Sequence, residues 1–337
     1  MNFELSISAT LTPDEYLTER MMSKLPVLLV EGEFDDIFFQ LVRDELLSND
    51  IVQLPLENAH QLRSIQIETP QMIASPDGEK LGHREKVELV CGLAGSDVDR
   101  TKLVGFVDRE FRRFIATTIL DDYLECSCQF GRVRWSRGHS IENIFFDYAI
   151  MRPVFRDLGV SSYYNVAEAL AATEEHFDDA LRVACALSLV GKDQELLGML
   201  YRTISSEHIR LGEKNIEFDV RLWATHLRER HKLDSGRVAA VVSAFAYYMN
   251  VVARSNMEVV RWMCHGHLGE TVLWSAFGAA VHLCCEKNGV PTHCRKVVSV
   301  SSRDRLIRYV GSWIRHAFHK STDNSPLECF RDFGIRC

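Results

Sequence analysis

Hydrophobic positions follow two different patterns along this chain of 337 residues. In the first part, short continuous apolar runs at 27–30 and 102–107 are separated by segments in which apolar residues recur at helical spacing. Such runs are typical of strands buried on both faces of a parallel sheet, and strands alternating with helices indicate an α/β fold. From Pro153 onward the spacing is helical, with few strand signals. The pattern therefore predicts an α/β domain, with a mostly parallel sheet flanked by helices, followed by an all-helical domain.

The first part can be divided into individual elements. Thr12 precedes Pro13, which is typical of a helix N-cap and first helical residue, so we expect a helix from about Pro13 to Ser23. The expected strands are Val27–Val30, Ile51–Leu56, Lys102–Val107 and Gly131–Trp135, and the other expected helices cover about Asp35–Leu47, Arg84–Leu93 and Ile141–Met151. Residues 57–81 are polar and contain Pro70 and Pro76, which predicts a loop or a small hairpin.

Three regions follow from these elements. Residues 1–24 form a lead-in with one helix, residues 25–152 form the α/β domain, and residues 153–337 form the helical domain. Helical spacing in the last region covers Val166–Val190, Gln194–Ile204, Asp219–Arg230, Arg237–Met263, Gly269–Cys285 and Arg303–His319. We expect the tail, residues 321–337, to pack back through Phe330 and Phe333.

Composition is that of a globular protein, with 46% hydrophobic and 26% charged residues. No apolar run reaches the roughly 18 to 20 residues that span a bilayer, and the N-terminus carries acids where a signal peptide needs a basic start. We therefore expect a cytoplasmic protein without a membrane partner. The ten cysteines lack CxxC spacing, so we expect reduced core residues rather than a disulfide framework.

Acidic residues are concentrated in the first half of the chain. Residues 1–150 hold 15 Lys/Arg and 26 Asp/Glu, a net charge of −11, whereas the remainder holds 24 and 21, a net of +3. A carboxylate-lined cation site produces such an excess, and so does a solvated acidic surface.

Several of these acids stand where predicted strands end. Glu31 follows the 27–30 strand, Asp108 and Glu110 follow the 102–107 strand, and Glu142 opens a predicted helix. Ligands of open α/β sheets bind beyond the carboxyl ends of the strands, so we expect these four carboxylates to face one crevice. Mg²⁺ prefers oxygen ligands and is often held by one or two carboxylates plus substrate phosphates, so the set suits metal-assisted phosphodiester chemistry.

The D-x-E spacing of Asp108 and Glu110 has a physical use. In an extended segment, residues two apart point to the same side, so both carboxylates would address one ion. The alternative is an ordinary charged helix start that includes Arg109. Asp35 and Asp36 fall in the first turn of a predicted helix, where the helix dipole favours acids whether or not they bind a ligand. For Asp36 we favour that structural role.

Three segments together resemble a known family: VLLVEGEFDD at 27–36, LVGFVDRE at 103–110 and SIENIFF at 140–146. They resemble the Toprim nucleases, most closely the DUF4435 subgroup, which includes the effector subunit of the bacterial anti-phage system PARIS. The resemblance covers the first 150 residues by motif. It extends to MCHGHLGETVL at 263–273, which is similar to a Gly-His or Gly-Lys segment of that subgroup. The resemblance implies a Toprim α/β catalytic domain.

The resemblance also implies roles for individual acids. Toprim proteins carry a glutamate after the first strand, matched by Glu31, and an Asp-x-Asp after a later strand, whose first aspartate is matched by Asp108. Glu110 stands in place of the second aspartate, a departure that leaves the number and placement of metal ions open. Asp35 matches an acid four residues after the glutamate in nuclease-type members, and Glu142 matches the SIEN acid. The implied catalytic residues are Glu31, Asp108, Glu110 and Glu142, and Mg²⁺ or Mn²⁺ would be held by Glu31, Asp35, Asp108 and Glu110.

Basic residues near these acids are candidates for phosphate contacts, with an exposed basic strand as the alternative. They are Arg109, Arg132, Arg134, Arg137 and His139. The resemblance makes Asn143, like Arg109, a candidate for contacting either a phosphate or the metal-binding carboxylates. The subgroup resemblance also makes His265 and His267 candidates, with packing between helices as the alternative.

Two further groups carry weaker signals. A basic side on the last helix suits either RNA binding or a solvated face; it comprises Arg303, Arg305, Arg308, Arg315, His316, His319 and Lys320. Zinc-ligand residue types at 282–294 match no common structural spacing; they are His282, Cys284, Cys285, His293 and Cys294.

We therefore expect a Mg²⁺-dependent endonuclease of bacterial defence that cleaves RNA, with transfer RNA suggested by the subgroup, or DNA. The resemblance implies an ABC-type ATPase sensor that restrains it, and the sequence has no GxxxxGK[ST] of its own. We expect an active homodimer, with Arg237–Cys285 as the candidate interface. The alternative is a catalytically degenerate Toprim-fold scaffold subunit. A primase or topoisomerase is disfavoured because no zinc ribbon or strand-passage architecture is recognisable.

Overall fold

The chain folds into two compact units that are interleaved in sequence. The computed structural model describes residues 10–48, 54–76, 79–94, 102–124, 129–159, 164–213, 215–287, 302–320 and 325–335. The first unit comprises Met1–Arg109, Cys126–Arg137 and Ala317–Cys337, and the second comprises Glu110–Glu125 and Gly138–His316. This division differs from the successive domains, 25–152 and 153–337, that the hydrophobic pattern predicts.

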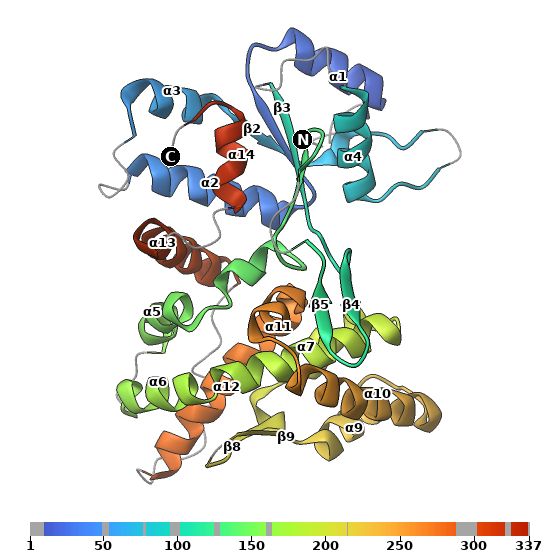
Figure 1. The fold of residues 1–337 in the computed structure, drawn as a ribbon, viewed down its shortest axis with the longest axis vertical. Helices are drawn as coiled ribbons and strands as arrows, with labels where there is room; N and C mark the ends of the chain where they lie inside the picture. The colour runs from blue at the N-terminus through green and yellow to red at the C-terminus, as the bar shows by residue number, and fades with distance from the viewer. Residues whose placement is uncertain are drawn as a thin grey trace, which may run out of the picture. The chain divides into compact units, whose positions relative to one another are not determined.

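A mostly parallel five-stranded sheet forms the centre of the first unit (Figure 1). Its strand order is β2 (Gln66–Glu68), β1 (Val27–Val30), β3 (Leu103–Val107), β7 (Val133–Trp135) and β6 (Gln129–Phe130). The first four strands run parallel, and β6 pairs antiparallel with β7 across a turn in which Gly131 has a φ of +61°. The parallel pairing brings the carboxyl ends of β1, β3 and β7 to one edge. The predicted strands at 27–30 and 102–107 are confirmed.

Helices cover both faces of this sheet. On one face, apolar side chains of α1 (Pro13–Met22) and α4 (His83–Leu93) form a core cluster with residues of β1 and β3. On the other face, α2 (Glu33–Ser48) places the Phe39 ring 5.0 Å from that of Phe106 in β3. A Cβ at Gly105 would lie 2.7 Å from Cys91 Sγ, so this glycine allows α4 to pack directly on β3. The result is a sheet whose central strands are buried on both faces.

The C-terminal segment belongs to the first unit, where α14 (Ser325–Asp332) packs beside α2 and α3 (Leu56–Ser64) (Figure 1). The Phe330 and Phe39 rings lie 5.9 Å apart, and the Gln61 side chain donates a hydrogen bond to the Phe333 carbonyl. Phe330 and Phe333 are fully buried. The predicted packing of the tail through these two residues is therefore confirmed.

One part of the predicted α/β order is wrong. We expected a strand at Ile51–Leu56, but its last residue, Leu56, is the first residue of the helix α3. Residues 51–53 lie outside the described part of the chain. The strand beside β1 is β2, within the segment that we expected to be a loop or hairpin. β2 has only three, partly buried residues, so it lacks the continuous apolar run that marks β1 and β3.

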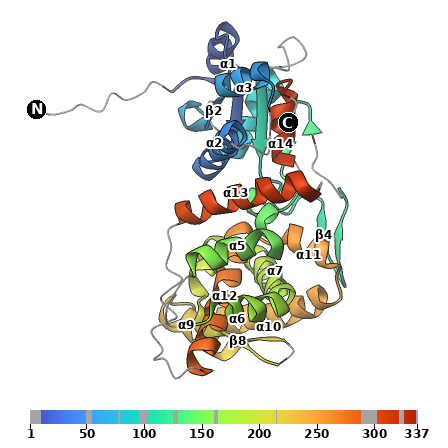
Figure 2. The ribbon, with the colours of Figure 1, turned by 90° about the vertical axis from the view of Figure 1, so that its left-hand side faces the viewer.

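Helices make up most of the second unit. They are η2 (Ile141–Phe145), α5 (Tyr148–Leu158), α6 (Val166–Glu175), α7 (Phe177–Asp193), α8 (Leu197–Leu200), η3 (Tyr201–Thr203), η4 (Ser206–His208), α9 (Val220–Glu229), α10 (Ser235–Ala253), α11 (Met257–Met263), α12 (Gly266–Lys287) and most of α13 (Ser302–Lys320). α12 packs against α6 and α7 (Figures 1 and 2). The predicted helical character of the second half is confirmed.

The second unit departs from the predicted elements in several places. The spans at 166–190 and 237–263 are each divided into two helices, α6 with α7 and α10 with α11. The expected helix at 141–151 is divided, because η2 ends at Phe145 and Asp147 caps the start of α5. The expected helix at 194–204 is reduced to α8 and η3. Two short antiparallel hairpins were not predicted: β4 (Phe114–Ala116) with β5 (Leu120–Asp122), and β8 (Ile209–Leu211) with β9 (Ile216–Phe218).

Among the helices of the described ranges, α10 and α12 are long and apolar enough to cross a membrane by length and composition alone. For α12, 78% of the apolar window is buried within the protein, as expected of the core helix of a soluble protein. For α10 the buried share is 28%, and Tyr247 on this helix is 54% exposed.

Candidate functional site

Two predicted carboxylates lie together at the sheet edge of the first unit. Glu31 directly follows β1 and Asp108 directly follows the neighbouring strand β3. The backbone N–H of Asp108 donates a hydrogen bond to Glu31 Oε2 at 3.2 Å. Both residues are partly buried. The acids predicted from the ends of the two apolar runs are thus adjacent, as the parallel sheet requires.

Asp35 has a structural role beside this pair. It is the third residue of α2, it is 6% exposed, and its Oδ2 accepts the backbone N–H of Gly32 at 3.0 Å. A carboxylate in this position caps the start of the helix and is stabilised by the helix dipole. Asp36 accepts a hydrogen bond from Gln40 Nε2 at 2.6 Å, an ordinary pairing one helical turn apart.

The extended conformation predicted for residues 108–110 does not occur. β3 ends at Val107, and Glu110 has a φ of +54°, in the left-handed region. The division between the units falls between Arg109 and Glu110. The argument that Asp108 and Glu110 point to one side of an extended segment is therefore wrong.

The arginines predicted to contact phosphate make bonds within the first unit. Arg109 is fully buried; its backbone N–H donates to Ser136 Oγ at 2.9 Å, and its Nη1 donates to the Arg137 carbonyl at 3.0 Å. Arg137 is itself buried, with 6% exposure. These bonds connect the segments that follow β3 and β7.

Arg134 contacts the C-terminal helix. Its Nη1 lies 2.8 Å from Glu328 Oε2, and it binds both carboxylate oxygens of Asp332. The Arg134 side chain is only 13% exposed. Together with Arg109, Arg134 is placed to hold the fold of the first unit, and Arg132 likewise donates to the Leu103 carbonyl, at 3.4 Å.

A second group of polar residues lies in the second unit, where the SIEN segment meets the HGH segment at 265–267. His267 Nδ1 lies 3.0 Å from Glu142 Oε1. The amide of Asn143 donates to the carbonyls of Arg261 and Cys264, each at 2.7 Å, and its Oδ1 accepts the Ser140 N–H at 2.8 Å. Asn143 therefore fastens η2 to the turn that precedes α12.

Close approach of the two segments depends on Gly266, the first residue of α12. A Cβ at this position would lie 2.4 Å from Ser140 Oγ and 2.6 Å from Glu142 Oε2. The absence of a side chain allows the Glu142 carboxylate to lie against the N-terminus of a long helix, where the helix dipole favours an anion.

Hydrogen bonds and burial set the protonation of this pair. Burial of Glu142 raises its pKa, but bonds from His267 and Ser140 outweigh burial and bring the pKa to about 2. The same bond with Glu142 raises the pKa of His267. The ionised form of Glu142 and the protonated form of His267 therefore stabilise each other.

Two more histidines continue from this pair towards the interior. The His267 and His265 rings lie 5.8 Å apart, and the His265 and His139 rings lie 4.9 Å apart. Burial and the neighbouring His265 lower the pKa of His139 well below its usual value, and neither of its ring nitrogens has a hydrogen-bond partner among the residues that the structure describes. The backbone N–H of Glu110 donates to the His139 carbonyl at 2.6 Å.

The sequence pattern did not predict that these histidines meet. The SIEN and HGH segments were each recognisable as motifs, but they lie more than 100 residues apart, and no local periodicity indicates their contact. Of the predicted site residues, the first unit contains Glu31, Asp35, Asp108, Arg109, Arg134 and Arg137, and the second contains Glu110, His139 and Glu142.

Within the described ranges, no group of three or more His, Cys, Asp or Glu residues is arranged to hold a metal ion. The donor chemistry of Glu31 and Asp108 nevertheless fits Mg²⁺, which is often held by one or two carboxylates with substrate oxygens and water completing its ligands.

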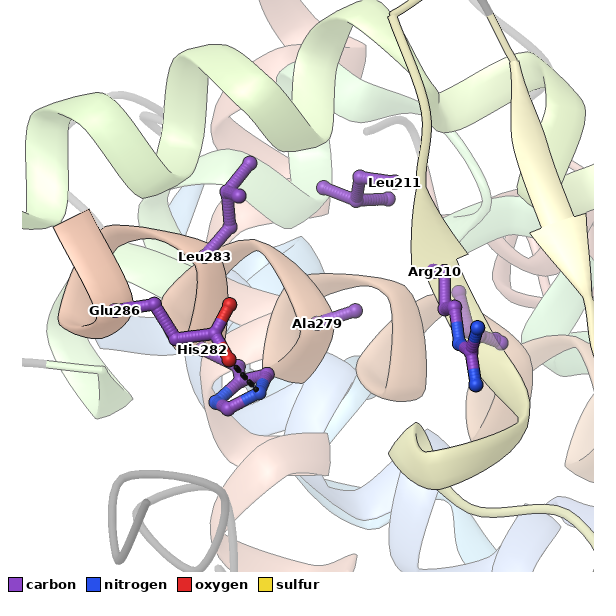
Figure 3. Close-up of a pocket in the computed structure, with 7 residues that line it drawn as sticks. Arg210, Leu211, Ala279, His282, Leu283 and Glu286 are labelled. Atoms are coloured by element: carbon purple, nitrogen blue, oxygen red, sulfur yellow. Dashed lines mark ion pairs between the residues drawn. The ribbon is translucent and has the colours of Figure 1, made fainter. Parts of the chain in front are cut away.

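The predicted zinc ligands do not gather in the part of the chain that the structure describes. His282 pairs with Glu286 at 3.0 Å and lines a pocket of about 330 Å³ between α12 and β8 (Figure 3). Cys284 and Cys285 are buried, while His293 and Cys294 lie outside the described residues. The other pocket-lining residues are Ile209, Arg210, Leu211, Ala279, Leu283 and Glu286.

Comparison with protein-family models finds no match to this chain, and comparison with curated proteins finds none either.

Proposed function

We propose that the protein is a metal-dependent phosphodiesterase of the Toprim type, with Glu31 and Asp108 at its centre. The observation that carries this proposal is the adjacency of these two residues at the carboxyl ends of neighbouring parallel strands, connected by the 3.2 Å bond. Ligands of open α/β sheets bind at this edge. The resemblance of the segments around Glu31 and Asp108 to Toprim nucleases supports the same reaction.

The two carboxylates have complementary roles in this proposal. Asp108 and Glu31 would hold Mg²⁺ or Mn²⁺, which when bound stabilises charge on the scissile phosphate and lowers the pKa of water. The Asp108 N–H keeps Glu31 Oε2 in place, so the Glu31 carboxylate is oriented to receive a proton from the attacking water. Asp35 supports the pair indirectly, because it fixes the turn at Gly32 that follows Glu31.

The biological setting is proposed from the resemblance alone. It suggests a cytoplasmic effector of bacterial anti-phage defence, restrained by an ABC-type ATPase sensor and active as a homodimer. The substrate would be RNA, with transfer RNA the first choice, or DNA. α10, on which Tyr247 is exposed, overlaps the candidate interface at Arg237–Cys285.

Cleavage of labelled transfer RNA and plasmid DNA, with Mg²⁺ or Mn²⁺ and with EDTA, tests the reaction. We expect Glu31→Gln and Asp108→Asn to lower the cleavage rate at least about 100-fold, and EDTA to abolish it. Glu33→Gln, at an exposed acid two residues from Glu31, is the matched control and should cleave like the wild type. Cleavage by both carboxylate variants at the wild-type rate would contradict the proposal.

A scaffold role is the second candidate, because Asp35 and Arg109 make structural bonds and Glu110 lacks the extended geometry. In that case the freed wild-type protein would cleave neither substrate but would still bind an ATPase partner.

A further inference from the structure

Three side chains lie side by side on the surface beside Glu142. They are the imidazole of His267, the phenol ring of Tyr201 and the guanidinium of Arg202. The Tyr201 and His267 rings meet edge to face, with centroids 5.6 Å apart. Arg202 Nε donates to Tyr201 Oη at 2.8 Å, and the guanidinium carbon lies 5.2 Å from the centre of the Tyr201 ring. We refer to these three residues as the 201–267 row.

The row is accessible at both ends, and the bond with Glu142 raises the pKa of His267, which favours its cationic form. Arg202 is exposed, and 51% of the His267 side chain is exposed. Glu142 engages Nδ1 of His267, so the ring is oriented with its Nε2 edge away from that carboxylate. A protonated imidazole has an N–H donor on each nitrogen, so the charged ring can bind Glu142 and an outside acceptor together.

The neighbouring charges contact His267 while about half of its side chain, 51%, stays exposed. Glu142 of η2 and Glu270 of α12 both favour its protonated form, and His265 and the Tyr201 ring lie beside it. Burial raises the pKa of Glu270, and Arg305 pairs with it at 3.2 Å, so the acid that binds His267 directly is Glu142.

We propose that the 201–267 row binds a single-stranded nucleic acid, with His267 and Arg202 contacting phosphates and Tyr201 stacking on a base. An aromatic ring between two cations provides both kinds of contact that single strands require. A small free anion would not stack on the Tyr201 ring, whereas a nucleic-acid base would. The choice of a nucleic acid as the ligand rests on the proposed function. The geometry of the row is independent of that function.

Binding without cleavage tests this inference. Fluorescence anisotropy in EDTA would follow labelled single-stranded RNA and DNA oligonucleotides of the same sequence, with wild type, His267→Gln, Tyr201→Leu and Arg202→Ala. We expect Tyr201→Leu to weaken binding at least about fivefold, with losses in the other two variants. Lowering the pH from about 8 to about 6 should tighten binding by the wild type but much less by His267→Gln.

His282→Gln is the matched control, because His282 lies on the same helix and also pairs with a glutamate at 3.0 Å. Arg202→Ala alters an exposed side chain, so its effect does not depend on an altered fold. Wild-type binding by all three row variants, equal weakening in His282→Gln, or no binding by the wild type would overturn the inference.

The same series separates this inference from the proposed function. Cleavage that requires Glu31, with normal binding by the row variants, would refute the row and leave the function standing. Binding that requires the row, with cleavage unaffected by Glu31→Gln, would refute the function and leave the row standing.

Discussion

The Glu142–His267 pair connects protonation to stability in the second unit. The raised pKa of His267 means that its contribution is fully present below the ordinary value of 6.5 and is lost as the pH rises through the raised pKa. The pKa of Glu142 is lowered from 4.5 to about 2, so its contribution is present above pH 4.5 and is lost as the pH falls towards 2. The pair therefore stabilises the fold most between about pH 4.5 and 6.5.

Glu142→Gln should lower the pKa of His267, because the substitution removes the anion bound at Nδ1. The accompanying loss of stability should be largest between about pH 4.5 and 6.5 and smaller above and below it. Titration of the histidine ring signals by NMR and urea unfolding at several pH values measure both effects. Glu286→Gln, which removes the comparable partner of His282, should leave His267 unchanged. An unaltered His267 pKa in Glu142→Gln would contradict the pairing.

The candidate site residues were predictable only where local sequence determines their position. Glu31 and Asp108 directly follow buried apolar runs, so the parallel sheet alone brings them together. The predicted extended geometry of Glu110 was wrong because its left-handed φ depends on the packing of the folded chain, which the D-x-E spacing does not reveal. His139 has no periodic signal, and its contact with His265 exists only in the folded chain.

Whole elements show the same limit. α1 was predictable because its signals are local: Thr12 and Glu15 form a capping box and Pro13 opens the helix. β2, β4 and β5 have three residues each, too few for alternation to distinguish them from loops. Their strand character depends on pairing with a neighbour, which a linear pattern does not contain.

Gly266→Ala tests how closely η2 and α12 must approach. The added methyl would overlap Ser140 Oγ and the Glu142 carboxylate, so the two segments must separate. We expect the free energy of unfolding to fall by about 1–3 kcal/mol, together with a lower His267 pKa, measured by urea unfolding and NMR. Gly92→Ala is the control, because a Cβ there meets nothing within 4 Å and a helical alanine should stabilise by up to about 1 kcal/mol. Equal stabilisation by both substitutions would show that a methyl group fits between η2 and the start of α12.

At the scale of the whole molecule, the order of the chain does not follow the order of the fold. The first unit needs residues from both ends of the sequence, since α14 contributes Phe330 to its core and two acids to Arg134. The packing of Phe330 and Phe333 was predictable from the sequence, but not the core that they join, because either unit can bury apolar side chains. A domain boundary placed where the hydrophobic pattern changes therefore assigns the C-terminal tail to the helices that precede it in sequence, whereas in the fold the tail belongs to the first unit.

Phe330→Ala is expected to destabilise the first unit and spare the second. Loss of this fully buried ring removes its contact with Phe39 and leaves a cavity, which lowers the free energy of unfolding by about 3–5 kcal/mol. Hydrogen exchange should accelerate in β1, β3 and α2 while α6, α7 and α12 keep their protection, because the ring packs within the first unit. Arg331→Ala, at the exposed neighbouring position, should change stability by less than about 0.5 kcal/mol. Faster exchange spread equally over both units would show that they unfold as one cooperative structure.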